Sequence, residues 1–295
     1  YITLEGHGRE DIDSSIDITR TMGWFSTFYP VRLESSDDLG TTLKVTKERL
    51  RSIPHKGLGY GALFGYKDLP KILFNYLGQF EGSESGFWHL SHEESGLSVS
   101  PGNKDAYVMS INGQVSDGQL RFWLRGRVCS LTMETLARSL EESLQKIIHY
   151  AGGQKRSYLT ASDVDNIIDQ KYLDELQRDR VIDSVYLANS LQQGFIYHAL
   201  SQGDEDDAYR VQLVWDYETS LDKECLRQAW MYALKRYGSL RMRFGWSEEL
   251  VQIIDKEGEL DWRFIDLSCE KDVSGESIRK IQEEDRREVY NLSFG

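Results

Sequence analysis

Cysteine is scarce in this chain: its 295 residues contain only Cys129, Cys225 and Cys269. An odd number of widely spaced cysteines fits reduced thiols and does not fit a disulfide framework or a zinc site. The six histidines show neither an H-x-x-x-H nor an H-E-x-x-H spacing. We therefore expect no metal centre, and the absence of a G-x-S-x-G motif argues against a serine hydrolase.

Long hydrophobic runs and an excess of basic residues are also missing. No apolar run approaches the roughly 20 residues that a membrane-spanning helix needs. A net charge of −13 opposes binding to nucleic acid, which depends on clustered Lys and Arg. We therefore expect neither a membrane nor a nucleic acid as partner. The first residues lack the basic start and apolar core of a secretory signal, which favours a cytoplasmic protein and is typical of the interior of a longer chain.

Proline is confined to the first third of the chain, where glycine also clusters, so this region should be rich in turns and loops. The length of 295 residues predicts two domains of about 150 residues each. Residues 153–183 are charged and weakly apolar, as is typical of an interdomain linker. The predicted domains are therefore residues 1–152 and 184–295.

Periodicity predicts both strands and helices in each half. Residues 106–115 and 119–128 have the pattern of two strands joined by a tight turn. Residues 132–150 have the pattern of an amphipathic helix packed on that sheet, beginning at a Thr132 cap. The remaining expected elements are helices at 172–178, 190–200 and 221–237, and strands at 209–217, 240–244, 250–254 and 261–265. Both halves are therefore predicted to be α+β.

The hexapeptide EGHGRE at residues 5–10 concentrates acidic, basic and flexible residues. One of the carboxylates of Glu5 and Glu10 could serve in proton transfer, with Arg9 setting its charge state. Glycine on both sides of His7 would let the backbone approach a substrate closely. A polar surface turn before a strand explains the same residues, and residue types alone favour that turn.

Two further stretches combine polar groups with glycine or aromatic residues. Residues 54–61, PHKGLGYG, include Gly59 and Tyr60, but their glycine spacing fits neither nucleotide-binding motif. A bend whose backbone lines a channel is expected there instead. Residues 74–80, FNYLGQF, place Asn75 and Tyr76 among aromatics, which suits either a hydrogen-bonded strand end or a pocket wall.

Four motifs in this order resemble those of nonribosomal peptide synthetase epimerization domains: residues 5–10, 20–30 (which include Trp24), 54–61 and 74–79. The resemblance covers the C-terminal lobe of such a domain, residues 1–152. Residues 190–194, with Gln192 and Gln193, resemble the first motif of a following condensation domain, and residues 236–244, with Arg236 and Arg241, resemble the second. In the second of these, Gly238 and Met242 stand where the family usually has an acidic residue and a threonine.

The resemblance implies a fold like that of chloramphenicol acetyltransferase, with two-layer lobes of mixed sheet and packed helices around a channel for phosphopantetheine arms. It implies L-to-D epimerization of an aminoacyl or peptidyl thioester on a carrier protein, followed by peptide-bond formation in the condensation domain. Glu5 is then one of the two acid/base groups that inversion needs, oriented by Arg9. The implied channel residues are His7, Trp24, Gly59, Tyr60, Asn75 and Tyr76.

The same resemblance predicts partners but no directly bound cofactor, because the substrate is carried on the 4′-phosphopantetheine of a carrier protein. The partners are upstream and downstream peptidyl carrier proteins and the adjacent adenylation domains. The His-His-x-x-x-Asp-Gly motif, which supplies the catalytic histidine in this family, is absent from the sequence. We therefore expect half of one domain joined to part of the next, within a much longer protein and inactive when separated from it.

Two other functions remain open at this stage. The segment could be a non-catalytic docking platform that positions carrier proteins between modules. Alternatively, the dominant activity could belong to the condensation portion, which would form a peptide bond to a D-configured donor.

Overall fold

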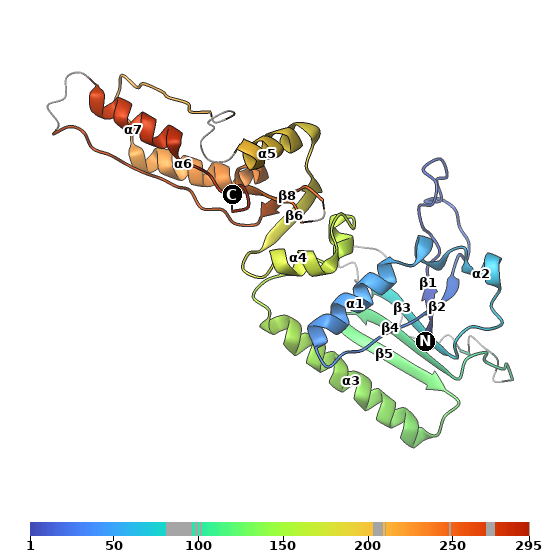
Figure 1. Cartoon of the computed structure of the whole chain (residues 1–295). Coiled ribbons are helices and arrows are strands. Elements are labelled where there is room, and N and C mark those ends of the chain that lie inside the picture. The colour runs from blue at the N-terminus through green and yellow to red at the C-terminus, as the bar shows by residue number, and fades with distance from the viewer. Residues whose placement is uncertain are drawn as a thin grey trace. The chain divides into compact units, whose positions relative to one another are not determined.

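The computed structural model describes residues 1–80, 96–97, 100, 102–202, 209, 211–247, 249–269 and 275–294. The chain divides into two compact units, Tyr1–Gln154 and Lys155–Gly295. Both combine a sheet with helices (Figure 1), and the predicted α+β class with a mixed sheet is confirmed. Within the described ranges, no helix is both long and apolar enough to cross a membrane.

A five-stranded mixed sheet in the order β2-β1-β3-β4-β5 forms the centre of the first unit. The central β3 is parallel to both of its neighbours, β1 and β4, whereas the outer strands β2 and β5 are antiparallel to theirs. The strands are β1 (Ile2–Gly6), β2 (Thr27–Val31), β3 (Ile72–Phe80), β4 (Met109–Ser116) and β5 (Gln119–Gly126).

The β4–β5 hairpin matches the expected pair of strands, with shorter ends. Asp117 and Gly118 form its turn with φ of 51° and 69°. Positive φ at both central residues is the geometry that suits the twist of a two-residue hairpin, which explains the Asp-Gly sequence.

Helices α1 (Leu39–Arg51), α2 (Tyr60–Phe64) and α3 (Ser130–Gly153) and the short 3₁₀ turn η1 (Pro54–Gly57) complete this unit. The prediction that Thr132 caps the long helix is wrong, because α3 begins two residues earlier, after Cys129. The thiol of Cys129 lies 3.0 Å from the Thr132 hydroxyl, so Thr132 bonds to the cap residue from within the first turn. Helices α1 and α3 meet where the Tyr150 hydroxyl lies against Gly40.

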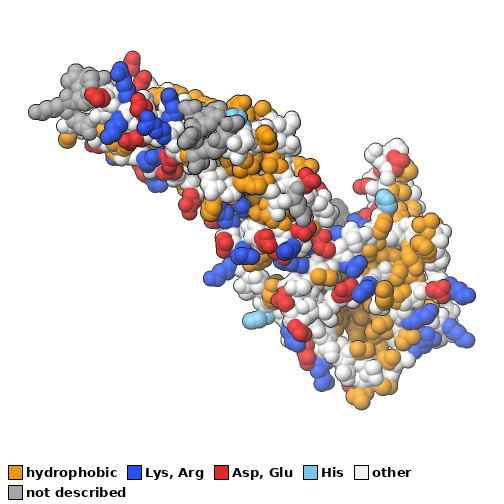
Figure 2. Space-filling view, viewed as in Figure 1, with side chains coloured by type: hydrophobic (Ala, Val, Ile, Leu, Met, Phe, Trp, Pro, Cys, Tyr) orange, Lys and Arg blue, Asp and Glu red, His pale blue; other side chains and the backbone are white. Residues whose placement is uncertain are grey.

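The sheet has one apolar face and one more polar face, since successive side chains point to opposite sides. Register partners on the apolar face are Leu4, Phe74, Ile111 and Leu124. Met133 of α3 packs on this face against Gly126, where a Cβ would lie 3.0 Å from the Met133 methyl carbon. Hydrophobic side chains gather over the sheet of this unit (Figure 2), so the helices cover the apolar face only in part.

The loop that joins β1 to β2 is held by Arg9. Its guanidinium donates to the carbonyls of Ile18, Thr21 and Gly23 at 3.3, 2.9 and 3.3 Å and lies 4.4 Å over the Phe25 ring. Gly8 has φ of +67°, and a Cβ there would lie 1.7 Å from the Phe25 carbonyl oxygen. The second glycine of the hexapeptide is therefore required for packing.

The second unit contains a three-stranded antiparallel sheet in the order β6-β8-β7. Its strands are β6 (Ile182–Leu187), β7 (Met242–Gly245) and β8 (Val251–Asp255). Its helices and 3₁₀ turns are η2 (Ala161–Val164), α4 (Gln170–Leu176), α5 (Ser190–Gln202), α6 (Lys223–Arg236), η3 (Gly238–Arg241) and α7 (Glu276–Arg287).

The stretch expected to be a linker, residues 153–183, is folded from residue 155 onward and belongs to the second unit. Val164, Ile168 and Leu173 are buried in one cluster with residues of β6 and β8. The Gln177 side chain also bonds to both backbone groups of Leu159, at 2.7 and 3.0 Å. Val164 ends η2, Ile168 lies in the bend that follows and Leu173 lies in α4, so these few apolar residues are spread over separate short elements among many charged ones.

Two expected strands are not formed. Residues 211–217 and 261–265 have no strand assignment, although the first alternates as a strand would. Alternation permits a strand, but a strand also needs a neighbour for its backbone hydrogen bonds. Among the described residues, the sheet ends at β6 and β7.

A buried ion pair joins the strands of the second unit. Asp255 at the end of β8 accepts from the Arg243 Nε at 2.9 and 3.1 Å and from the Arg180 Nη1 at 2.9 Å. The side chains of Arg243 and Asp255 are only 8% and 5% exposed. Both charges are compensated by hydrogen bonds, which a buried pair requires.

We predict that Asp255→Asn destabilises the second unit by about 3 kcal/mol, because it leaves a buried Arg243 charge without its partner. Native-state hydrogen exchange of the β8 amides would measure this loss locally. The control is Asp261→Asn, since Asp261 is 67% exposed and 3.5 Å from Arg263. Equal protection of β8 in both variants would contradict the prediction.

We also predict that Gly8→Ala destabilises the first unit more than Gly118→Ala. Both glycines have φ near +68°, but a Cβ meets the Phe25 carbonyl at Gly8 and nothing within 4 Å at Gly118. The left-handed conformation alone costs an L-residue about 1–2 kcal/mol, so the difference between the variants isolates the contact with Phe25. Hydrogen exchange of the β1 and β2 amides is the measurement, and equal losses would exclude a role for that contact.

Candidate functional site

Glu5 lies near the end of β1, between Phe28 of β2 and Asn75 of β3. Its side chain is half-buried. Among the described residues, none forms a hydrogen bond or ion pair with its carboxylate. A carboxylate that is partly withdrawn from water and held by no fixed partner is available for proton transfer.

Glu5 is part of a row of side chains that crosses four strands. Register pairs Glu5 with Asn75, Asn75 with Asn112, and Asn112 with Trp123. Residues directly opposite one another on adjacent strands point to the same face of a sheet. The structure thus brings Glu5 and Asn75 together, and it adds Asn112, which sequence reasoning missed because the register between β3 and β4 is set by pairing.

Tyr76 does not join this row, although it was expected to line the same channel as Asn75. It follows Asn75 directly in β3 and pairs with Gly113, so its side chain lies on the opposite, apolar face. The register then shifts between Tyr76 and Gln79, where Gly78 has φ of +94°. This irregularity is a β-bulge of the kind that redirects a strand end.

Arg9 was expected to orient Glu5, and the structure contradicts this. Within the described chain, all hydrogen bonds of its guanidinium go to carbonyls of the β1–β2 loop, and its ring contact is with Phe25. Arg9 therefore holds the loop. In the sequence, the charge of Arg9 suggested an interaction with Glu5, four residues away. Its long side chain instead reaches backbone groups nine or more residues away.

The other residues of the hexapeptide form a separate cluster. The His7 Nδ1 accepts from the backbone N–H of Arg9 at 3.0 Å, so the Nε2 carries the ring proton and faces Glu10 at 3.1 Å. Glu10 also pairs with Lys56 at 2.8 Å and is 15% exposed. Of the two carboxylates that the sequence could not separate, Glu10 is thus occupied, whereas none of the described residues binds that of Glu5.

Tyr107, just before β4, is a further group near Glu5. Burial raises the pKa of its phenol, and the negative charges of Glu5 and Asp105 raise the pKa further. The phenol therefore stays protonated as a hydrogen-bond donor. Neither composition nor spacing pointed to it, because its proximity to Glu5 depends on the order of the strands.

The glycine-rich motif at 54–61 forms a tight bend. His55, Lys56 and Gly57 have φ of 45°, 48° and 77°, and Gly57 packs against the Tyr29 ring. Gly59 precedes α2, and the Tyr60 ring lies 5.2 Å from that of Phe64. The bend carries Lys56 to Glu10, so two of the motifs meet through one ion pair.

The four residues expected to mark a second domain make contacts within the second unit. Gln192 exchanges two hydrogen bonds of 2.9 Å with Asn189 at the start of α5 and bonds to Gln252 at 3.1 Å. Gln193 donates to the Ala188 carbonyl at 2.9 Å. Arg241 donates to the carbonyls of Asp255 and Lys256, and Arg236 lies 5.7 Å from the Tyr237 ring centre.

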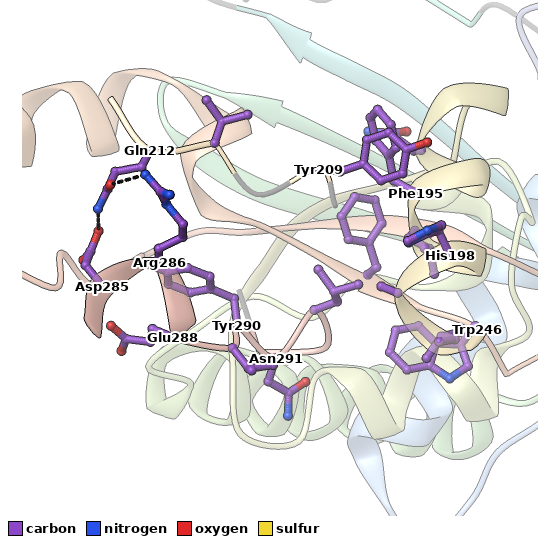
Figure 3. Close-up of a pocket in the computed structure, with 18 residues that line it drawn as sticks. Phe195, His198, Tyr209, Gln212, Trp246, Asp285, Arg286, Glu288, Tyr290 and Asn291 are labelled. Carbon is purple, nitrogen blue, oxygen red and sulfur yellow. Dashed lines mark hydrogen bonds between the residues drawn. The ribbon is translucent and has the colours of Figure 1, made fainter. Parts of the chain in front are cut away.

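A pocket of about 820 Å³ lies in the second unit and is lined by Gln192 among others. Phe195 and His198 of α5 face Tyr209 across ring-centre distances of 4.7 and 5.1 Å (Figure 3). Elsewhere in the pocket, Gln212 bonds to Asp285 at 2.8 Å and to Arg286 at 3.5 Å. This pocket contains no member of the Glu5 row. In the part of the chain that is described, no group of three acidic, His or Cys side chains could hold a metal ion.

Comparison with known proteins identifies the family. A family model described as "Condensation domain" matches residues 1–167 and 182–295. A mycosubtilin synthase protein of Bacillus subtilis is 32% identical over 314 residues, which cover 99% of this chain and 12% of that protein. A linear gramicidin synthase protein of Brevibacillus parabrevis is 31% identical over 325 residues, which cover 99% of this chain and 6% of that protein.

Among solved structures, the epimerization domain from the third module of tyrocidine synthetase B is similar, with 38% identity and a TM-score of 0.46. That match covers 50% of this chain and 37% of the solved one. The chain spans only a small part of its curated relatives, 12% and 6% of the two synthases. On the family match over both of its units, the chain belongs to the condensation-domain family of nonribosomal peptide synthetases.

Proposed function

We propose that residues 1–152 are the C-terminal lobe of an epimerization domain, and that residues 184–295 are part of the N-terminal lobe of a following condensation domain. The first would invert the α-carbon of an aminoacyl or peptidyl thioester on a carrier protein. The observation that carries the proposal is the half-buried Glu5 carboxylate, which is free of partners among the described residues and lies beside Asn75. The four motifs in family order support it.

The chemistry requires a base, a donor to the enolate and proton delivery to the opposite face. The thioester acidifies the α-hydrogen, and Glu5 removes or returns it. The Asn75 carboxamide, one strand away, can donate a hydrogen bond to the enolate oxygen or to the arm that carries the substrate. Inversion needs a second acid/base group, which the resemblance assigns to the His-His-x-x-x-Asp-Gly motif that this sequence lacks.

The substrate reaches the site on a phosphopantetheine arm, so the partners of this segment are peptidyl carrier proteins and, in the same synthetase, adenylation domains. This chain itself holds no cofactor in the proposal. The reaction would be an isomerase step that supplies a D-configured donor to the condensation domain.

We predict that Glu5→Gln in the enzyme carrying this sequence slows α-hydrogen exchange by about 10²- to 10⁴-fold, the usual contribution of a general acid/base group. The assay follows deuterium from solvent entering a carrier-bound L-aminoacyl group. Glu134→Gln is the control, because Glu134 lies exposed on α3. Exchange at the wild-type rate in Glu5→Gln would rule out the proposed role.

A docking platform for carrier proteins is the second candidate function, and one observation favours it. The loop that Arg9 holds presents Met22 and Trp24 to solvent, 94% and 88% exposed. Ordered, exposed aromatic side chains are frequent anchors of protein interfaces. In this second function, Trp24 contacts the carrier protein.

We predict that Trp24→Ala weakens binding of a labelled holo-carrier protein by tenfold or more, about the effect of losing an interface anchor. Leu63→Ala is the control, since Leu63 is also a highly exposed apolar residue of the first unit. Glu5→Gln should leave this affinity unchanged. Loss of binding in Glu5→Gln, or none in Trp24→Ala, would contradict the docking surface.

A further inference from the structure

Glu5, Asn75 and Asn112 are neighbours on one face of the sheet, and all three are half-buried. Within the described residues, none of the three side chains has a hydrogen-bond partner. This differs from the second unit, where the carboxamides of Gln192 and Gln212 bond to Gln252 and Asp285. Their polar atoms are not fully buried, so the row offers its hydrogen bonds to water or to a ligand.

We propose that Asn112 is a further binding residue of this site, and that Asn75 and Asn112 bind successive amide groups of the arm that carries the substrate. This inference rests on the proposed function and deepens it. A carboxamide presents both a donor and an acceptor, as does each secondary amide of the arm. The pair is therefore chemically matched to a chain with repeated amide groups.

The spacing of the row agrees with the spacing of those groups. Neighbouring strands are about 4.8 Å apart, which places Asn75 about 5 Å and Asn112 about 10 Å from Glu5. In the arm, a cysteamine unit precedes the first amide and a β-alanyl unit separates it from the second, each about 5 Å long when extended. With the reacting carbon at Glu5, the first amide lies at Asn75 and the second at Asn112.

Trp123 is the next residue of the row and is exposed. Its ring offers an apolar surface beyond Asn112, where the dimethyl carbons of the pantoyl unit follow the second amide. The arm thus crosses the strands from β5 toward β1 and delivers its thioester to the Glu5 carboxylate.

The test compares two stable probes with the same S-propyl group, S-propyl pantetheine with two amides and S-propyl N-acetylcysteamine with one. Each is titrated into the full 295-residue chain, with the side-chain amide signals of Asn75 and Asn112 followed by NMR. We expect both probes to shift the Asn75 signals and only the pantetheine probe to shift those of Asn112.

Affinities of variants provide the second measurement. Asn112→Ala should weaken the pantetheine probe by about 2- to 12-fold, the loss of one net hydrogen bond, and leave the shorter probe unchanged. Asn75→Ala should weaken both probes. Asn103→Ala, in an exposed loop, is the matched control and should change neither. Asn112→Asp keeps the shape of the side chain but lacks the amide donor, and serves if the alanine variant does not fold.

The inference is overturned if the wild-type chain binds neither probe, if Asn112→Ala binds both as the control does, or if it loses affinity equally for both. Failure of the proposed function gives a different result, because binding would follow the pattern above while Glu5→Gln exchanged its substrate at the wild-type rate.

Discussion

The parallel pairing of β1, β3 and β4 is the constraint on which the candidate site depends. Backbone hydrogen bonds between these strands place Glu5 beside Asn75 and Asn75 beside Asn112. A slip of one residue in either pairing would move a whole strand of side chains to the opposite face. The apolar partners Leu4, Phe74 and Ile111, which lie on the helix-covered face, hold the register because any slip would expose them.

The hexapeptide shows how one short motif divides into parts with different roles. Glu10 is paired with Lys56 and His7, Arg9 is bonded to three carbonyls, and Gly8 allows Phe25 to approach. These residues build the loop after β1. Glu5, which lies within the strand and ahead of the loop, keeps a carboxylate that none of the described residues binds. One motif thus contains both residues that hold the loop and, directly before them, the unbound carboxylate of Glu5. The loop contacts of Arg9 also hold Trp24 at the surface.

The second unit depends on a different interaction. Asp255 forms ion pairs with Arg243 and Arg180 at the edge of the core. Part of that core comes from residues 155–183, a stretch rich in charged residues. The capping box of Thr160 and Asp163 and the cap of α4 by Asp169 fix the turns that deliver the apolar residues to that core. The polar residues of this stretch therefore determine local structure. A linker is also rich in polar residues, so composition alone does not distinguish the two.

The sequence by itself determined the class of fold, the hairpin with its Asp-Gly turn, the long helix and the order of the motifs that marks the family. These follow from local periodicity, turn chemistry and residue identity, which act between near neighbours in the chain. Tertiary structure decided that Glu5, and not Glu10, keeps a carboxylate that no described residue binds, and that Arg9 binds the carbonyls of the β1–β2 loop. It also decided that Asn112 lies on the same face of the sheet as Glu5 and Asn75, and that Tyr76 lies on the opposite face. Each of these depends on strand register and on contacts between distant residues, and many sequences with the same local pattern could pair their strands in another way.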